Sequence, residues 1–357
     1  MFNRFFGNRA VAESLERMIA GGRVAQTILL AGPEGVGKAT LARRFAARLL
    51  AQGSPEKEAE AAEKIEKDDL SRPENRKILE EREKWPSEKR AEEPLFFATH
   101  PDFVTVCPEG PLRQISIQQM RLARSRAQLR PLKGRWRVFL IDHMERAGAQ
   151  AADALLKTLE EPPGHLVLVM TAENPFDLPP TIRSRSVTFW MAPLSESEME
   201  EAAQAGGWKD ARRRIALAGG CPGVAAMLDL EDYERRRAVA LAMLEAAAGA
   251  AGFALWVKQS QPVVAAKTEK LSHYMRPMYS LLSDLLVLSC GGRRLKNEDL
   301  REKLEKLAGG VHFAWLREAV ELVDGWDGLE RRNVQKAAVA DQFVVKLAGC
   351  ARAVRNS

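Results

Sequence analysis

The sequence predicts an α/β domain with a parallel sheet, followed by a small helical domain and an all-α C-terminal domain. Three observations support this. Short apolar runs alternate with helical patterns in the first half of the chain, which is typical of a parallel sheet covered on both faces. Strand patterns stop near residue 195, and only helical patterns follow. The length of 357 residues is too great for a single core and suits two or three domains.

The expected strands of the α/β domain are short apolar runs at residues 27–31, 103–106, 136–141, 166–171 and 187–190. The helices expected between them cover about 38–50, 116–129 and 149–161. The second of these helices begins with a capping box, because Gln119 follows Ser116 by three positions and the two side chains can bond to free backbone N–H groups.

We expect the α/β domain to span residues 1–192, the small helical domain 193–232 and the C-terminal domain 233–357. The small domain should contain two helices followed by a Gly-Gly-Cys-Pro-Gly break. Its helical patterns lie at 196–205 and 209–218, and the break lies at 219–223. The patterns of the last domain lie near 233–250, 268–290, 297–307, 311–325 and 328–354.

The composition is that of a globular protein rather than a disordered, fibrous or membrane protein, with 46% hydrophobic and 29% charged residues. No uncharged apolar run reaches the roughly 18 residues of a membrane span, and the first ten residues lack a signal-peptide core. We therefore expect a cytoplasmic protein that does not contact the membrane. The 4 cysteines include no pair at C-x-x-C spacing, so neither a zinc knuckle nor a disulfide framework is indicated.

Residues 51–95 have the pattern of a charged insertion. They carry 14 acidic and 10 basic side chains, and almost no apolar periodicity. This pattern predicts a solvated charged helix pair or a partly disordered loop, with a docking surface as the alternative.

A basic stretch follows the insertion, with 8 basic and no acidic residues between Glu109 and Asp142. Arg121, Arg124 and Arg130 are expected on neighbouring turns of one helix, where they could contact DNA phosphates without reading bases. The alternatives are a solvated face, or ion pairs with the acidic insertion of the same chain.

A glycine-rich loop of sequence Gly-Pro-Glu-Gly-Val-Gly-Lys, residues 32–38, lies between the first strand and its helix. Such a loop lets backbone amides face the phosphates of ATP or ADP, while the lysine reaches the outer phosphates. The next residue normally supplies the hydroxyl that binds Mg²⁺, but it is Ala39 here, and Thr40 is turned by about 100° around the helix. The candidate nucleotide-binding residues are Gly32, Gly35, Gly37, Lys38, Ala39, Thr40 and Asp142.

Asp142 ends a buried strand, where a carboxylate can hold the metal ion or its water. An active ATPase of this type usually has a glutamate next, which polarises the attacking water, but this chain has His143. We interpret His143 as a surface residue rather than a base. Both substitutions affect hydrolysis more than nucleotide contact, so the sequence predicts either the relic of a nucleotide site or a weak, non-hydrolysing site.

Two longer motifs, at residues 151–163 and 180–186, closely resemble the clamp-loader branch of the AAA+ ATPases. The Thr-His-Pro-Asp sequence at 99–102 and the break at 219–223 fit the same family. The resemblance is dense up to about residue 228 and diffuse beyond it. It implies that the three domains are an AAA+ domain, a helical lid and an oligomerisation collar.

The resemblance implies a subunit of the replicative clamp loader, a ring-shaped pentamer that places the sliding clamp on primed DNA. The partners would be the gamma/tau and delta subunits of DNA polymerase III. In this family the arginine of the Ser184-Arg185 motif reaches the ATP of a neighbouring subunit as an arginine finger. ATP-hydrolysing members carry a sensor arginine near the position of Gly223. The expected role is that of a non-hydrolysing or weakly nucleotide-binding subunit.

Two other functions stay open at this point: a gamma-like subunit that hydrolyses ATP itself, and a stand-alone DNA-binding module. Many members of the family have a four-cysteine zinc module where this chain has the insertion. Because residues 51–95 contain no cysteine, we expect no zinc and no other metal site.

Overall fold

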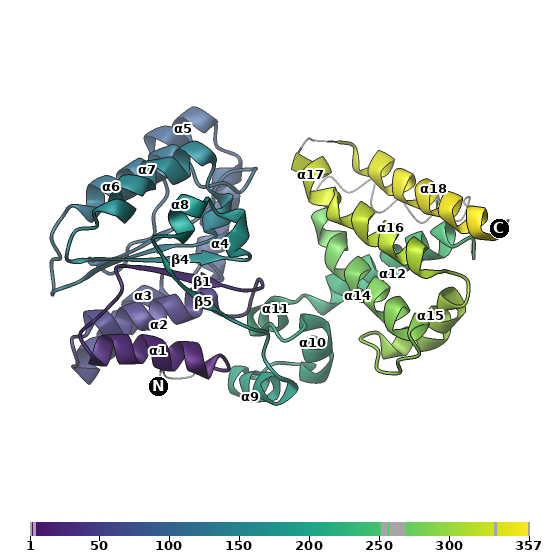
Figure 1. Ribbon diagram of the computed structural model, residues 1–357, viewed down its shortest axis with the longest axis horizontal. Helices are drawn as coiled ribbons and strands as arrows, with labels where there is room; N and C mark the ends of the chain where they lie inside the picture. The colour runs from purple at the N-terminus through teal and green to yellow at the C-terminus, as the bar shows by residue number, and fades with distance from the viewer. Residues whose placement is uncertain (1, 3–4, 251–255, 257–268, 332–333, 356–357) are drawn as a thin grey trace. The chain divides into compact units, whose positions relative to one another are not determined.

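The computed structural model describes residues 2, 5–250, 256, 269–331 and 334–355, and these divide into two compact units. The first unit is Met1–Ala226 and the second is Met227–Ser357. The first unit contains the predicted sheet together with the helices expected of the small helical domain (Figure 1).

The five predicted strands form one parallel sheet with the order β2-β3-β4-β1-β5. Each strand confirms an apolar run of the sequence. Their bounds are β1 Thr27–Ala31, β2 Phe103–Val106, β3 Arg137–Ile141, β4 Leu166–Ala172 and β5 Val187–Trp190. β1 to β4 are buried throughout, whereas the edge strand β5 is partly exposed. The parallel α/β fold that the sequence predicts is therefore correct.

Helices cover both faces of the sheet, because alternate side chains of each strand point to opposite faces. In β1, Ile28 and Leu30 pack into one core and Leu29 into the other. The first face is covered by α1 Arg9–Ala20, α2 Lys38–Leu50 and α3 Pro55–Glu66 (Figure 1). The second face is covered by α6 Ile117–Ala127, α7 Ala149–Glu160 and α8 Pro180–Arg183 (Figure 1). The predicted capping box of α6 is present, with Ser116 and Gln119 bonded reciprocally.

Three short helices, α9 Glu196–Gly206, α10 Ala211–Ala218 and α11 Pro222–Met227, follow the sheet. The first begins with a capping box formed by Ser195 and Glu198. Two 3-10 turns, η1 Met144–Arg146 and η2 Pro175–Asp177, follow β3 and β4. They begin just beyond the carboxyl ends of these strands, where the candidate site lies.

The insertion differs from its prediction, because it forms three helices that pack onto the first unit. These are α3, α4 Pro73–Glu83 and α5 Ser87–Glu92. The apolar residues Ala61, Ile65 and Leu79 are buried, and hydrogen bonds and ion pairs add to this packing. The buried guanidinium of Arg82 pairs with the buried carboxylate of Glu109, outside the insertion. The expectation of a partly disordered loop was wrong, whereas that of a charged helix pair was correct in part, because the helices are largely exposed but three in number and α3 and α4 each bury a few residues.

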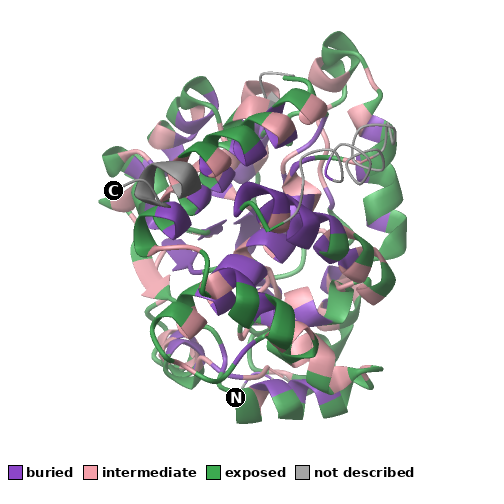
Figure 2. Ribbon diagram, turned by 90° about the vertical axis from the view of Figure 1, so that its right-hand side faces the viewer, coloured by how far each residue is buried: buried purple, intermediate pink, exposed green. Residues whose placement is uncertain are grey.

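The second unit is all helical and has its own core, which includes Trp256, Trp315 and Trp326. Several of its helices carry buried residues on one side and exposed residues on the other (Figure 2). They are α12 Leu230–Ala247, α14 Ser272–Ser289, α15 Arg301–Ala308, α16 Phe313–Asp324, α17 Trp326–Arg331 and α18 Lys336–Arg355, with the 3-10 turn η3 Glu298–Leu300. The single helix expected at 328–354 is therefore two helices, α17 and α18. Within the described ranges, no helix is long and apolar enough to cross a bilayer.

Candidate functional site

The glycine-rich loop joins β1 to α2, and two of its glycines have no room for a side chain. Gly32 has φ +148°, and an added Cβ would lie 2.3 Å from Met191 O. Gly35 has φ +75°, and its Cβ would lie 2.7 Å from Val224 Cγ2. Both positions therefore require glycine for close backbone packing as well as for the left-handed conformation.

Lys38, the first residue of α2, is buried against the loop. Its Nζ donates to Gly32 O at 2.6 Å and to Pro33 O at 2.9 Å. Burial lowers the pKa of Lys38, although nearby carboxylates, Glu173 first among them, oppose that effect. The ammonium group is thus held beside the loop, where it would face a phosphate.

Ala39 packs against the core on the α2 side of the sheet, so its position offers an apolar contact and no oxygen ligand. Thr40 is partly exposed on the next position of the helix. The structure thus gives the residue after Lys38 a packing role in place of the metal-binding role of a hydroxyl.

Asp142 follows β3 and is buried, with its Oδ1 accepting a hydrogen bond of 2.6 Å from the hydroxyl of Thr171. The Thr171 hydroxyl accepts in turn from the backbone N–H of His143 at 2.9 Å. Thr171 belongs to β4, the neighbour of β3 in the sheet. These two hydrogen bonds therefore connect the carboxyl ends of the adjacent strands β3 and β4 at the site.

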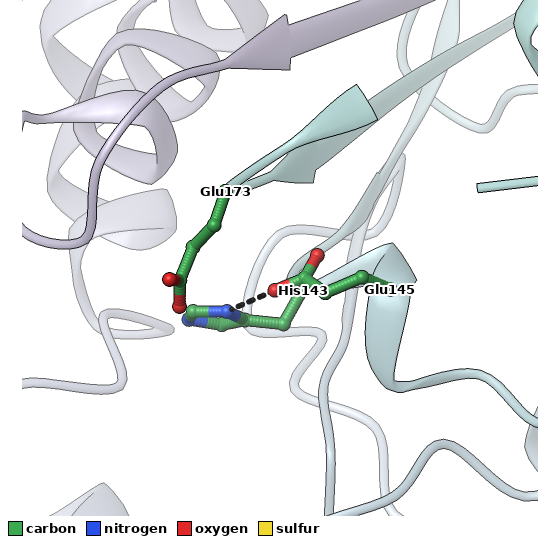
Figure 3. A group of neighbouring side chains, drawn as sticks. All are labelled: His143, Glu145 and Glu173. Atoms are coloured by element: carbon green, nitrogen blue, oxygen red, sulfur yellow. Dashed lines mark hydrogen bonds and ion pairs between the residues drawn. The ribbon is translucent and has the colours of Figure 1, made fainter. Parts of the chain in front are cut away.

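His143 adopts a left-handed conformation with φ 57° and is half-buried, so the expectation of a surface residue was wrong. Its Nδ1 lies 2.9 Å from Glu145 Oε1, and donor atoms of His143, Glu145 and Glu173 all lie within 4.8 Å of one another (Figure 3). Burial would lower the pKa of His143, but the hydrogen bond to Glu145 and the charges of Asp142 and Glu145 outweigh it and raise the pKa to about 9.

The carboxylates of this cluster have opposite pKa shifts. Partial burial of its carboxyl group raises the pKa of the otherwise exposed Glu173, and the like charges of Glu34 and Glu145 add to that shift. Burial also acts to raise the pKa of Glu145, but the hydrogen bond from His143 keeps it below its usual value. Sequence reasoning missed both glutamates. The available signal was that each follows the end of a predicted strand, and such ends meet at one edge of a parallel sheet.

Arg185 lies two residues after α8, on the surface of the first unit. Its Nη2 forms an ion pair of 3.0 Å with Glu160 Oε1, and its Nη1 donates to Thr181 O at 3.0 Å. Ser184 is also exposed, and its hydroxyl donates to Thr181 O at 3.3 Å. The motif therefore presents an exposed guanidinium that is held by its own chain.

Gly223 lies near the start of α11 and rests on the glycine-rich loop. Its N–H donates to Gly35 O at 2.8 Å, and an added Cβ would lie 3.0 Å from that oxygen. The next residue, Val224, packs against Gly35. The backbone of α11 thus touches the loop at the position where the resemblance places a sensor arginine in ATP-hydrolysing members.

The Thr-His-Pro-Asp motif before β2 organises the surrounding loops. Thr99 donates from its N–H and hydroxyl to Asp68 of the insertion. Asp102 accepts from the N–H groups of Leu132 and Lys133 at 2.6 and 2.7 Å. The motif therefore connects the insertion and the basic stretch to the sheet.

The basic stretch only partly matches its prediction. Arg121 and Arg124 are exposed on α6, and neither forms an ion pair with the part of the chain that the structure describes. Arg130 is exposed but lies beyond the end of α6 at Ala127, so its expected place on the helix was wrong. Pro131 follows Arg130 directly and cannot donate the backbone hydrogen bond to Ala127 that a continued helix would need. Two other members pair with the insertion, Arg113 with Glu83 and Lys133 with Glu60, which confirms one of the alternatives for this stretch.

Solved structures resemble the chain at low sequence identity. A gamma subunit-related protein of DNA polymerase III from Thermotoga maritima has a TM-score of 0.47 and 14% identity, covering 95% of this chain and 98% of that one. The clamp loader delta protein of Bacillus subtilis has a TM-score of 0.33 and 12% identity, covering 95% and 99%.

Sequence comparison connects the chain to subunits of DNA polymerase III. It is 32% identical over 233 residues to the delta' subunit of Pseudomonas aeruginosa, covering 61% of this chain and 60% of that protein. It is 25% identical over 202 residues to the gamma subunit of Buchnera aphidicola, covering 56% of this chain and 47% of that protein. The chain thus matches less than two thirds of the length of either relative. A family model described as DNA polymerase III, delta subunit, matches residues 7–195, more than half of the 357 residues. The chain therefore belongs to the DNA polymerase III delta-subunit family, as the clamp-loader motifs indicated.

Proposed function

We propose that the chain is a delta-prime-type subunit of the replicative clamp loader, which completes the ring and lends Arg185 to the ATP site of a neighbouring subunit. The observation that carries the proposal is a contrast between two sites. The chain has an exposed arginine in the family motif, whereas its own phosphate loop is followed by the apolar Ala39. The Arg185 motif can therefore act on a neighbouring subunit, whereas the phosphate loop lacks the hydroxyl ligand of Mg²⁺ that hydrolysis normally needs.

The residues of the loop fit the phosphates of ATP or ADP better than they fit the accompanying metal ion. Gly32, Gly35, Gly37 and Lys38 would hold the phosphates at the start of α2. When bound, the nucleotide would supply the phosphoryl group of the reaction. However, Ala39 offers no oxygen to Mg²⁺, and one oxygen of Asp142 already accepts from Thr171. We therefore expect slow or no ATP hydrolysis at this loop, because Ala39 and Asp142 offer few free oxygen atoms to Mg²⁺.

A guanidinium at a neighbouring site would offset negative charge on the transferring phosphoryl group, an effect worth about 10³ to 10⁵ in rate in related NTPases. Arg185 suits this role because it is exposed, and because its ion pair with the exposed Glu160 is of a kind that costs little to break. When the ring assembles, Arg185 would break its ion pair with Glu160 and bind a phosphate oxygen of the neighbouring ATP instead.

The remaining parts of the proposal follow from the family. Residues 193–232 would act as the lid and 233–357 as the collar that joins the gamma/tau and delta subunits. Through the assembled ring, the chain would serve the sliding clamp and primed DNA in the cytoplasm. Arg121, Arg124 and Arg130 would meet DNA phosphates there, and their exposure supports this.

The test is a reconstituted loader in which only the ATP site next to this chain is left active. Arg185→Ala should lower ATP hydrolysis by about 10³ or more, while the mass of the complex stays the same. Lys157→Ala is the matched control, because it removes another exposed cation, from the helix that carries Glu160, and should leave the rate unchanged. Unchanged hydrolysis after Arg185→Ala would remove the arginine from this role.

Turnover by the isolated chain separates the proposal from its alternative. We expect little or no ATP hydrolysis without partners. Rapid hydrolysis that is abolished by Lys38→Ala would instead identify a gamma-like ATPase subunit.

A further inference from the structure

One cluster beside the glycine-rich loop has no part in the function proposed above. It consists of the imidazole of His143 and the carboxylates of Glu145 and Glu173. His143 and Glu145 follow β3, and Glu173 follows the adjacent strand β4. In Figure 3 the ring of His143 lies between the two carboxylates, and one donor atom from each residue lies within 4.8 Å of the others. Parallel strand order therefore gathers three metal-binding groups at one edge of the sheet.

Glu145 provides a second, independent observation. Its side chain is only 10% exposed, and its Oε1 accepts the hydrogen bond from His143. Its Oε2 is buried and has no hydrogen-bond partner in the described part of the chain. An ionised oxygen that is removed from water without a partner is costly. A cation held by both oxygens of the Glu145 carboxylate would satisfy this atom.

The surrounding charges also favour a cation. Glu34 and Asp142 add negative charge beside the cluster. Lys38 lies close enough to interact with it, but its ammonium donates to the carbonyls of Gly32 and Pro33. Among the described residues, neither Glu145 nor Glu173 forms an ion pair with a lysine or an arginine. The cluster therefore carries negative charge that no lysine or arginine in the described part of the first unit neutralises by direct contact.

We propose that His143, Glu145 and Glu173 bind a divalent transition-metal ion of the zinc class. One imidazole and two carboxylates are a donor set that suits Zn²⁺ and Co²⁺, whereas Mg²⁺ takes oxygen ligands. His143 Nδ1 and Glu145 Oε1 lie 2.9 Å apart in a hydrogen bond that the metal would replace, with release of the imidazole proton, and a small separation would bring them to the roughly 3.4 Å between ligands that zinc bonds of about 2.1 Å produce in a tetrahedral site. Glu173 is exposed, so its side chain is free to close on the ion.

The geometry also gives the ion an accessible position. Three protein ligands leave one place in a tetrahedral shell for water or for an oxygen of a phosphate. This site is distinct from the four-cysteine zinc module that some clamp-loader subunits carry, because it contains no thiolate and lies outside the insertion.

The experiment uses the untagged full-length chain, freed of metal with a chelator and without nucleotide. It is titrated with Co²⁺, followed by visible absorption, and with Zn²⁺, followed by calorimetry. We expect a single bound ion, and at least about tenfold weaker binding in both Glu173→Gln and His143→Ala. Glu173→Gln keeps the test valid if the half-buried His143 proves necessary for folding, because Glu173 is exposed.

Two control variants distinguish metal coordination from the loss of any half-buried histidine and from the loss of nearby negative charge. His165→Ala removes another half-buried histidine of the first unit, and Glu34→Gln removes a nearby negative charge that is not among the three ligands. His165→Ala should bind the metal like the original chain, and Glu34→Gln should weaken binding less than Glu173→Gln does, because it removes a nearby charge but no ligand. The proposal is overturned if the original chain binds neither ion, if Glu173→Gln binds them undiminished, or if Glu34→Gln weakens binding as much as Glu173→Gln does.

Discussion

Arg185 and Glu160 form an ion pair across the surface of the first unit, with 3.0 Å between Nη2 and Oε1. The arginine comes from the segment after α8, and the glutamate is the last residue of α7. The side chains are 36% and 52% exposed, so solvent screens the pair and its contribution to stability is about 1 kcal/mol at most. The pair orients the guanidinium without holding it firmly.

Removing Glu160 should therefore release Arg185 without unfolding the protein. In Glu160→Gln we expect a change of less than about 1 kcal/mol in the free energy of unfolding. Hydrolysis at the adjoining site should stay equal or rise by up to about fivefold, because the arginine no longer leaves a carboxylate to reach a phosphate. Steady-state ATPase of the reconstituted loader measures this. Adding Arg185→Ala to this variant should cancel any gain, and a fall in Glu160→Gln alone would contradict the account.

Gly35→Ala should destabilise the first unit through overlap as well as through backbone strain. The new Cβ would lie 2.7 Å from Val224 Cγ2 and 2.8 Å from Val224 N. Gly22→Ala is the matched control, because Gly22 also has a positive φ, of 64°, but has nothing within 4 Å. We expect about 1 to 2 kcal/mol from the left-handed conformation in both variants. Overlap should add about 1 to 3 kcal/mol in Gly35→Ala alone. Urea unfolding followed by circular dichroism checks this, and equal losses would refute the close packing of α11 on the loop.

His100 should make stability depend on pH. It is buried, and its Nδ1 accepts a hydrogen bond of 3.1 Å from the N–H of Asp102, which requires a neutral ring. Burial lowers the pKa of His100 below its usual 6.5, against the opposing charge of Asp102. The unfolded chain thus takes up a proton before the folded chain does. Stability from this group is present above about pH 6.5 and is lost as the pH falls below it.

The measurement is the free energy of unfolding as a function of pH, in the original chain and in His100→Gln. The loss below about pH 6.5 should be smaller in the variant, because glutamine does not titrate. His165→Gln should keep the profile of the original chain. The same loss in His100→Gln as in the original chain would assign the dependence to other groups.

Arg82 should be essential for docking of the insertion. It pairs with Glu109, and the two side chains are 7% and 3% exposed. Arg82→Ala would leave a buried carboxylate without its ion-pair partner, which should cost about 3 to 5 kcal/mol. Arg72→Ala removes an exposed pair with Glu74 and should cost less than about 1 kcal/mol. Denaturant unfolding compares the two. Replacing both partners, in Arg82→Met with Glu109→Leu, should restore much of the loss, and similar small costs in both single variants would show that the insertion is held otherwise.

The sequence was most informative where structure depends on neighbours along the chain. The strand at 27–31 and the capping box of Ser116 and Gln119 match the structure, because apolar runs and caps act over a few residues. The packing of the insertion was not predicted, because it depends on residues that are distant along the chain. Arg82 pairs with Glu109, which lies 27 residues further along the chain, and no local sequence pattern predicts that pairing.

At the candidate site, too, some features follow from the local sequence and others only from the folded structure. Residue types and spacing alone predict the glycine-rich loop, the apolar Ala39 after its lysine and the family motif around Arg185. Only folding shows that Glu173 comes within 4.8 Å of His143 and Glu145, and that Gly223 rests on Gly35. These contacts follow from the order of the strands in the sheet and from the packing of α11, which are set by the burial of the whole core and not by any short segment.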